Sequence, residues 1–175
     1  MKEFKIGYHF CTKEFYNKLK EKQEIKADDR NCLELKDKGG LSSAYKYLFK
    51  EKMINNGNGM FFLWGDKKNK GTTIKYCNEN EASHILLELR IPADICIDTN
   101  YENWCSFIMD LEEADGDYQL ADEICREDFG IKDGLEGSYN NIYDISGDKD
   151  ILQILIPYIK YDWIESLSYV ENKVV

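Results

Sequence analysis

The stretch HILLELRIP, residues 84–92, constrains the fold of this chain more than any other. Its apolar residues Ile85, Leu87, Leu89 and Ile91 are each separated by one residue. Successive side chains of a strand point to opposite faces, so this spacing predicts a β-strand with one unbroken apolar face. Pro92 has no backbone N–H to donate and is expected to end the strand. The fold must therefore contain a sheet with at least one face in the core.

Other periodic segments predict the elements around this strand. Further strands are expected over 3–10, 60–66, 72–77, 94–98 and 158–164, with 72–77 pairing back on 60–66 across a turn. Helices are expected over 13–24 and 43–55, capped by Thr12 and Ser42, and over 100–111, 117–128 and 149–157. The segment 130–148, rich in Gly, Asn and Asp, is expected to be a loop. Because helices and strands alternate without a regular βαβ rhythm, we predict an α+β fold with a mainly antiparallel sheet flanked by helices.

The inward faces of two of these helices follow from their apolar spacing. In 100–111 the expected core residues are Trp104, Phe107, Ile108 and Leu111. In 117–128 they are Leu120 and Ile124. The tail after residue 171 is expected to fray.

Length and cysteine usage predict one domain in a reducing compartment. A chain of 175 residues falls in the usual range of a single domain, so we expect one domain over residues 1–175. No apolar run approaches the roughly 20 residues that cross a bilayer, and the charged N-terminus does not resemble a signal peptide. The six cysteines form no C-x-x-C pair, so we expect reduced thiols, a cytoplasmic location and no metal site.

The negative charge is concentrated in residues 112–150. This segment has thirteen acidic and three basic residues, a difference equal to the net charge of −10 of the whole chain. Binding to nucleic acid phosphates requires Lys and Arg, so this segment is not expected to contact nucleic acid. We expect an acidic, loop-rich segment that is either a solvated surface or a surface for a basic protein partner.

Sequence motifs for common reactions are missing. The chain has no G-x-x-x-x-G-K phosphate loop, no G-x-G-x-x-G, no G-x-S-x-G and no H-E-x-x-H. The acidic stretch DLEEADGDYQLADE does not fit a calcium loop, because placing Gly116 at the sixth position puts Leu111 at the first. Chemistry would therefore depend on residues that are far apart in the sequence.

A few single residues are candidates for such a site. His9 follows Tyr8 at the end of the first expected strand, where it is either a reactive group or a packed side chain. Trp64, followed by Gly65 and Asp66, is either an aromatic platform beside an acid or a core residue before a turn. Glu88, with Arg90 two positions along, is either an exposed ion pair or a buried acid in a cleft.

Several segments in order resemble one family of small bacterial and phage-borne domains of unknown function. They are TKEFYNKLKEKQEIKAD, AYKYLFKEKM, FFLWGD, ILLELRIPADICIDTNYENWCSFI and LQILIPYIKYDWI, which together span most of the chain. By this resemblance Tyr45, Trp64, Asp98 and Trp104 are the pattern residues. The chain departs from the family at Tyr47, where tryptophan is usual, and at IDTNYENW. That family has no established function, so the resemblance implies a bacterial or phage protein, with a role in bacterial defence or counter-defence as one option.

The opening of the chain also resembles, more distantly, ADP-ribosyltransferase-like folds. The similarity is a strand ending in Tyr8-His9 that is followed by a helix and a polar loop. It implies that His9 holds the ribose of NAD, that Tyr45 or Tyr76 stacks on nicotinamide, and that Glu88 stabilises positive charge in the transition state.

Two functions therefore remain open. One is a cytoplasmic binding domain whose acidic surface meets a basic protein. The alternative is a transferase that binds NAD through His9 and an aromatic residue. The second requires that His9 and the central aromatic and acidic side chains converge on one hollow at the rim of the sheet.

Overall fold

The computed structural model describes residues 3–28, 40–54, 58–65, 73–146 and 152–173. Its internal contacts divide the chain into two compact units. We call residues 1–26, 61–97 and 152–175 the sheet unit, and residues 27–60 and 98–151 the helical unit. Each unit is assembled from segments that are far apart in the sequence. The expectation of one domain over 1–175 stays a prediction.

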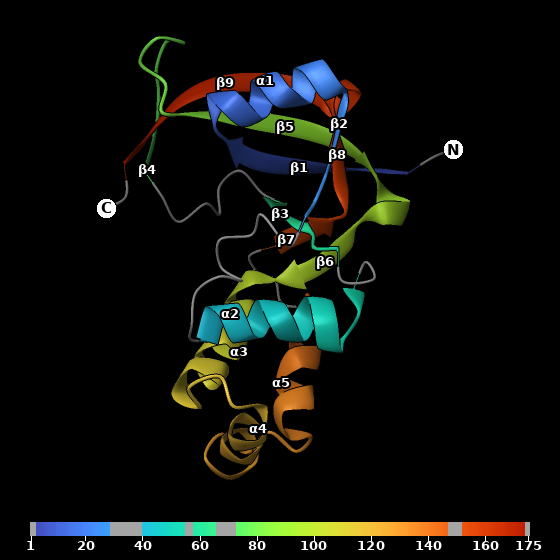
Figure 1. The fold of residues 1–175 in the computed structure, drawn as a ribbon, viewed down its shortest axis with the longest axis vertical. Helices are drawn as coiled ribbons and strands as arrows, with labels where there is room; N and C mark the ends of the chain where they lie inside the picture. Colours follow the sequence, from blue (N-terminus) through green and yellow to red (C-terminus); the bar gives the residue numbers. More distant parts are fainter. Residues whose placement is uncertain (1–2, 29–39, 55–57, 66–72, 147–151, 174–175) are drawn as a thin grey trace. The chain divides into compact units, whose positions relative to one another are not determined.

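The strands belong to one large sheet and one small sheet (Figure 1). The seven-stranded sheet has the order β4-β9-β5-β1-β3-β7-β6. These strands are β1 (Phe4–Cys11), β3 (Phe61–Trp64), β4 (Thr73–Tyr76), β5 (His84–Pro92), β6 (Ile97–Asn100), β7 (Leu152–Ile156) and β9 (Ile164–Lys173). The small sheet pairs β2 (Glu24–Lys26) with β8 (Tyr158–Lys160). The pairings β1–β3, β1–β5, β3–β7, β4–β9 and β5–β9 are antiparallel.

The long pair β1–β5 separates the two faces of the sheet. Its register joins Phe4 to Pro92 and continues without a break to Cys11 and Ile85. The face that carries Leu87 and Leu89 forms the core, and both leucines are fully buried. The alternation read in HILLELRIP therefore sets the buried face, as predicted.

Helix α1 (Lys13–Lys22) covers this core face. The Thr12 hydroxyl accepts from the backbone N–H of Phe15 at 3.1 Å, which caps the helix as the sequence predicts. Leu19 is fully buried, and Phe15 and Tyr16 pack beside it. The predicted α+β class with a mainly antiparallel sheet is confirmed.

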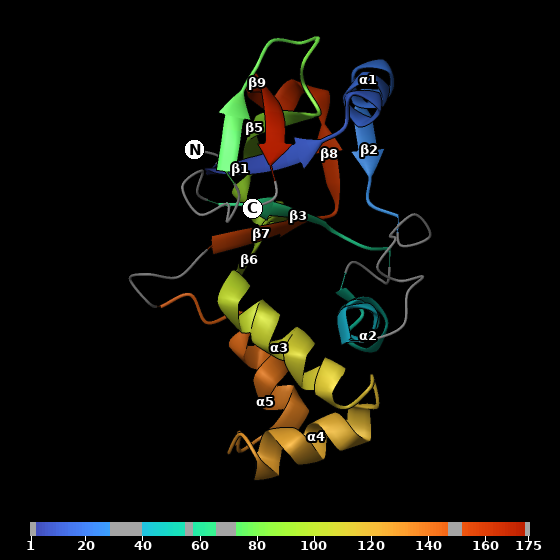
Figure 2. The same cartoon turned by 90° about the vertical axis from the view of Figure 1, so that its left-hand side faces the viewer.

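The helical unit contains four α-helices within its described residues. They are α2 (Gly40–Lys46), which continues as a π-helical turn η2 (Tyr47–Glu51), α3 (Tyr101–Glu113), α4 (Tyr118–Glu127) and α5 (Gly134–Asn141). Helix α3 packs against each of the other three, and Figure 2 shows α3 beside α5. Asn100 caps α3 by accepting from the N–H groups of Glu102 and Asn103. Asp117 caps α4 in the same way.

The second helix was expected over 43–55, but α2 and its π-helical continuation begin at Gly40 and end at Glu51. The helix begins at Gly40, and Ser42 is a buried residue inside it and not its cap. A Cβ on Gly40 would lie 2.6 Å from the backbone nitrogen of Glu112, so only glycine allows α2 to approach α3 this closely.

Two segments have a different secondary structure from the one expected. Residues 149–157, expected to be a helix, contain strand β7, whose last four residues are buried. A short run that is apolar on both faces has no clear period, and β7 pairs with β3. Residues 130–148, expected to be a loop, contain helix α5.

Strand β4 differs from the prediction in its pairing partner, and strand β9 differs from it in where it ends. Strand β4 was expected to pair with β3, but its partner is β9. The end of the chain was expected to fray after 171, but β9 continues to Lys173. None of the helices that the structure describes combines the length and apolar character that a bilayer crossing requires.

Helix α4 turns a different face inward from the one expected. Its buried residues are Ala121 and Cys125, whereas Leu120 is 43% exposed. On α3 the expected residues Trp104, Phe107 and Leu111 are buried.

Two identical substitutions test these inward faces. We expect Leu111→Ala to lower the free energy of unfolding by about 2–5 kcal/mol, because Leu111 is fully buried and leaves a cavity. The matched variant Leu120→Ala is expected to change it by less than about 1 kcal/mol, because that side chain is exposed. Urea unfolding followed by circular dichroism measures both. Equal losses would show that α4 buries the face with Leu120.

Candidate functional site

His9 lies on the core face of the sheet unit, among aromatic rings. Its ring is 5.4 Å from that of Phe15 and 5.7 Å from that of Phe61, in edge-to-face contact with both. Burial lowers the pKa of His9 from 6.5 to about 4, against the opposing effect of a backbone hydrogen bond with Phe62. His9 is therefore a neutral imidazole in aromatic packing at pH 7.

Glu88 lies on the other face of the same sheet. The register pairs Tyr8 with both Glu88 and Trp64, so these three side chains share one face. His9 follows Tyr8 directly and points to the opposite face. The Ser166 hydroxyl donates to Oε2 of Glu88 at 3.3 Å. The expectation that His9 and Glu88 converge on one hollow is therefore wrong, because the sheet separates them.

The other predicted residues lie elsewhere or are not described. Tyr45 and Trp104 both belong to the helical unit, where their rings meet edge to face at 5.6 Å. Trp104 is only 4% exposed and packs in the interior of that unit. Asp98 lies in β6, and Asp66 lies outside the described residues.

The helical unit contains a pocket that was not predicted from the sequence. Its volume is about 400 Å³, within the range of ligand pockets. Helix α3, the segment after α4 and helix α5 form its walls. Its main lining residues are Met109, Asp110, Glu113, Phe129, Ile131 and Ser138. We call it the α3 pocket.

Polar residues of α3 form one wall of the α3 pocket. Asn103, Ser106, Asp110 and Glu113 follow one another at spacings of three or four residues, which places them on one face of the helix. This stripe is the sequence signal for the pocket. Asn103 also donates through Nδ2 to the backbone carbonyl of Asn141 at 2.8 Å, which joins α3 to α5 at the pocket.

Asp110 is the most deeply buried acid of this stripe. Its exposure is 7%, and it accepts a hydrogen bond from the Ser138 hydroxyl. Its second neighbour is Cys125, which is fully buried. Burial, the nearby charge of Asp110 and a hydrogen bond to Asp110 raise the pKa of the Cys125 thiol to about 12. The thiol stays protonated at pH 7, so both groups that donate to Asp110 are neutral.

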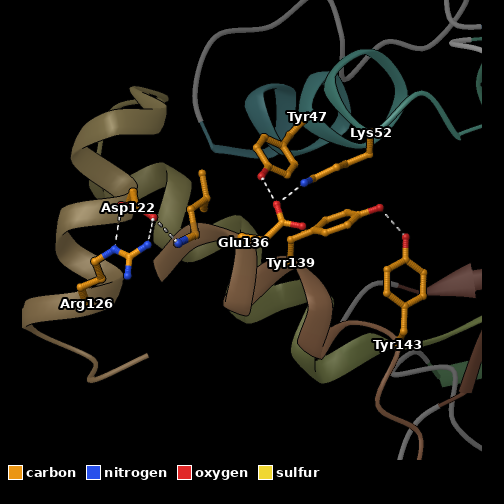
Figure 3. Close-up of polar contacts among 8 residues, drawn as sticks. Tyr47, Lys52, Asp122, Arg126, Glu136, Tyr139 and Tyr143 are labelled. Atoms are coloured by element: carbon orange, nitrogen blue, oxygen red, sulfur yellow. Dashed lines mark hydrogen bonds and ion pairs between the residues drawn. The ribbon is translucent and has the colours of Figure 1, made fainter. Parts of the chain in front are cut away.

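Lys52 is paired elsewhere in the helical unit (Figure 3). Its ammonium binds Glu136 and lies 5.0 Å from the ring centroids of both Tyr47 and Tyr139. The Tyr47 hydroxyl donates to the same Glu136 oxygen at 3.1 Å. Burial alone would lower the pKa of Lys52, but hydrogen bonds to Glu136 and Tyr47 raise it. The Lys52 ammonium lowers the pKa of Glu136 in turn, so both groups are charged at pH 7.

Arg126 is paired with Asp122 within α4 (Figure 3), and it also bonds to the segment before α5. Its Nε donates to Asp122 at 2.9 Å, and its Nη1 donates to the backbone carbonyl of Lys132 at 2.7 Å. Asp122 also accepts from the backbone N–H of Leu135 at 2.9 Å, which fixes the start of α5. The hydrogen bond from Arg126 is the main reason that the pKa of Asp122 is lowered.

Residues that could hold a metal or form a disulfide are few in the described part of the chain. No three His, Cys, Asp or Glu side chains in this part are grouped so that they could hold a metal ion. The five cysteines it contains, Cys11, Cys77, Cys96, Cys105 and Cys125, are free thiols.

Comparison with known proteins identified no relative of this chain. No protein-family model matches the chain, and no curated protein or solved structure is significantly similar to it. The resemblances to a family of bacterial and phage domains and to ADP-ribosyltransferase-like folds therefore stay predictions.

The packing of His9 predicts a pH effect on stability. The folded state holds His9 neutral down to about pH 4, whereas the unfolded chain protonates it near pH 6.5. Stability from this residue is therefore complete above pH 6.5 and is lost as the pH falls toward 4. Between pH 7 and pH 5 we expect the wild type to lose up to about 2 kcal/mol more unfolding free energy than His9→Phe, measured by urea unfolding. Equal losses would contradict the enclosed position of the ring.

The contacts of Asp122 predict a local stability effect. We expect Asp122→Asn to lower the unfolding free energy by about 1–2 kcal/mol, because it weakens the bonds to Arg126 and to the Leu135 N–H. The neighbouring variant Glu123→Gln removes the same charge from an exposed site and is expected to change it by about 0.5 kcal/mol or less. Thermal unfolding compares the two, and equal effects would contradict the role of Asp122 at the start of α5.

Proposed function

We propose that this chain is a binding domain whose helical unit contacts a basic protein partner and makes no covalent change. The observation that carries the proposal is the division of charge between the units. Over their full sequence ranges the helical unit has 21 acidic and nine basic residues, whereas the sheet unit has 12 acidic and 14 basic residues. The negative charge of the chain therefore belongs to one structural unit.

Part of this charge is exposed on two neighbouring helices. The exposed acids at the end of α3 and on or directly after α4 are Glu112, Glu113, Asp115, Glu123, Glu127 and Asp128, which we call the acidic surface. The basic residue among them in the sequence is Arg126, which is bonded to Asp122. A surface with charge of one sign attracts partners of the opposite sign and speeds their association.

The geometry supports the NAD-binding alternative less well. That reading needs His9 and Glu88 beside one ligand, and they point to opposite faces of the sheet. His9 is also packed between Phe15 and Phe61. The binding reading needs no such convergence, and we therefore prefer it.

A cytoplasmic location is part of the proposal. The five cysteines that the structure describes are free, and unpaired thiols are usual in reducing compartments. A role in bacterial defence or counter-defence has its support in the sequence resemblance alone.

Peptide binding at two salt concentrations tests the proposal. We expect a pool of synthetic peptides rich in Lys and Arg to bind the full chain, measured by fluorescence anisotropy, and a matched pool rich in Asp and Glu not to bind. Binding should weaken strongly between about 0.1 M and about 1 M salt, as the screening length falls from about 10 Å to about 3 Å. No binding of the basic pool, or binding unaffected by salt, would refute the proposal.

A pair of triple variants locates the binding surface. Neutralising Glu123, Glu127 and Asp128 to their amides is expected to weaken binding of the basic pool by roughly tenfold. The control neutralises three exposed acids of the sheet unit, Glu14, Glu21 and Glu81, and should leave binding nearly unchanged. Equal effects of the two variants would mean that net charge alone, and not the helical unit, attracts the peptides.

A further inference from the structure

We propose that the α3 pocket binds the guanidinium group of an arginine side chain, with Asp110 as its counter-ion. The inference rests on the proposed function, since the arginine belongs to the basic partner. It adds to that function a binding place, the α3 pocket, and a bound side chain, arginine, which pairs with Asp110. The acidic surface alone defines neither.

The carboxyl group of Asp110 is buried in the wall of the α3 pocket. A carboxylate that is removed from water is costly unless an opposite charge or several hydrogen bonds compensate it. Asp110 is 93% buried, and its neighbours Ser138 and Cys125 donate only as neutral groups. The side chain of Glu113 adds a second negative charge to the same pocket. A cation in this pocket would therefore gain from two acids.

Two cations of the helical unit, Lys52 and Arg126, are held by acids other than Asp110. Among the residues that the structure describes, no Lys, Arg or His lines the α3 pocket. Lys52 pairs with Glu136, and Arg126 pairs with Asp122. A cation from another molecule would therefore not have to displace one of these contacts.

The α3 pocket is also lined by exposed apolar side chains. Met109 is 66% exposed and Phe129 is 49% exposed, although both are large hydrophobic side chains. Together with Ile131 they line the opening beside two acids. Exposed apolar groups that adjoin a buried acid suit a ligand with an apolar stem and a charged end.

Arginine fits this combination better than lysine does. Its planar guanidinium is more weakly hydrated than an ammonium group and stacks on aromatic faces such as that of Phe129. It also presents several donors, so it can contact Asp110 and the side-chain or backbone oxygens of neighbouring polar residues at once. An anionic ligand would be repelled by Asp110 and Glu113.

Calorimetry with a matched pair of peptides tests the inference. The probe is a basic peptide selected from the pool above that contains one arginine between apolar residues, and its partner has citrulline, the neutral isostere, at that position. We expect the citrulline peptide to bind the wild type at least roughly tenfold more weakly. Substitution of the same arginine by lysine should give an intermediate affinity. Blocked arginine as a free small molecule should bind more weakly than the peptide, which separates a peptide site from a small-molecule site.

Two variants of the pocket and one control complete the test. Asp110→Asn should remove the difference between the arginine and citrulline peptides, and Phe129→Ala, which changes only an exposed side chain, should reduce it. Glu127→Gln, outside the pocket, should leave the ratio of the two affinities unchanged. Circular dichroism shows whether Asp110→Asn is folded. If that variant is unfolded, the effect of Phe129→Ala on the ratio of the two peptide affinities decides the test.

The outcomes separate this inference from the proposed function. If basic peptides bind with salt sensitivity but arginine and citrulline bind equally well, the pocket inference is wrong and the acidic surface remains the binding site. The same conclusion follows if neither pocket variant changes the ratio of affinities. If no basic peptide binds, both the proposed function and the inference fail. Tighter binding of free blocked arginine than of the peptide would also overturn the peptide site.

Discussion

The carboxylate of Asp110 is the constraint on which the account of the helical unit depends. It lies at a pocket wall, is nearly fully buried, and receives hydrogen bonds from Ser138 and Cys125, which are both neutral. Two cations of the helical unit are held by other acids. Glu136 holds Lys52 between two tyrosine rings, and Asp122 holds Arg126 while fixing the start of α5. These two cations therefore contribute to the folding of the unit, and under the proposed function Asp110 and the acidic surface contact the partner.

Those same contacts explain a helix that local sequence does not predict. The segment GLEGSYNN of α5 has two glycines and two asparagines, which are weak helix formers. It is helical because its neighbours hold it: Asp122 at its first turn, Lys52 at Glu136, and the packing of Tyr139 against Phe107. In short helices such tertiary contacts contribute more than intrinsic propensity.

The sequence predicted correctly those elements of the sheet unit that a short local pattern specifies. The alternation of β5 and the Thr12 cap of α1 are each complete within a few residues. The pairing of β4 with β9 joins segments almost a hundred residues apart, and no local pattern specifies it. The five-residue strand β7 is apolar at four positions, so its period gave no distinction between helix and strand.

The candidate site was predicted less well for a similar reason. His9 was correctly placed in the first strand, although two more strand residues follow it, but the face to which it points depends on a register that the sequence does not reveal. A shift of one residue would have placed it beside Glu88. The polar stripe of α3 was visible at helical spacing, but such a stripe is also typical of a solvated face. Only the position of α5 and of Phe129 makes it the wall of a pocket.

Nuclear Overhauser effects between the chain and an arginine peptide would locate the site at which a basic partner binds. The full chain would carry labelled methionine methyl groups and phenylalanine rings, and the peptide would carry one arginine. We expect cross-peaks from the arginine side-chain protons to Met109 and Phe129. Cross-peaks to other methionines or phenylalanines without these two, or none from a peptide that binds, would contradict it.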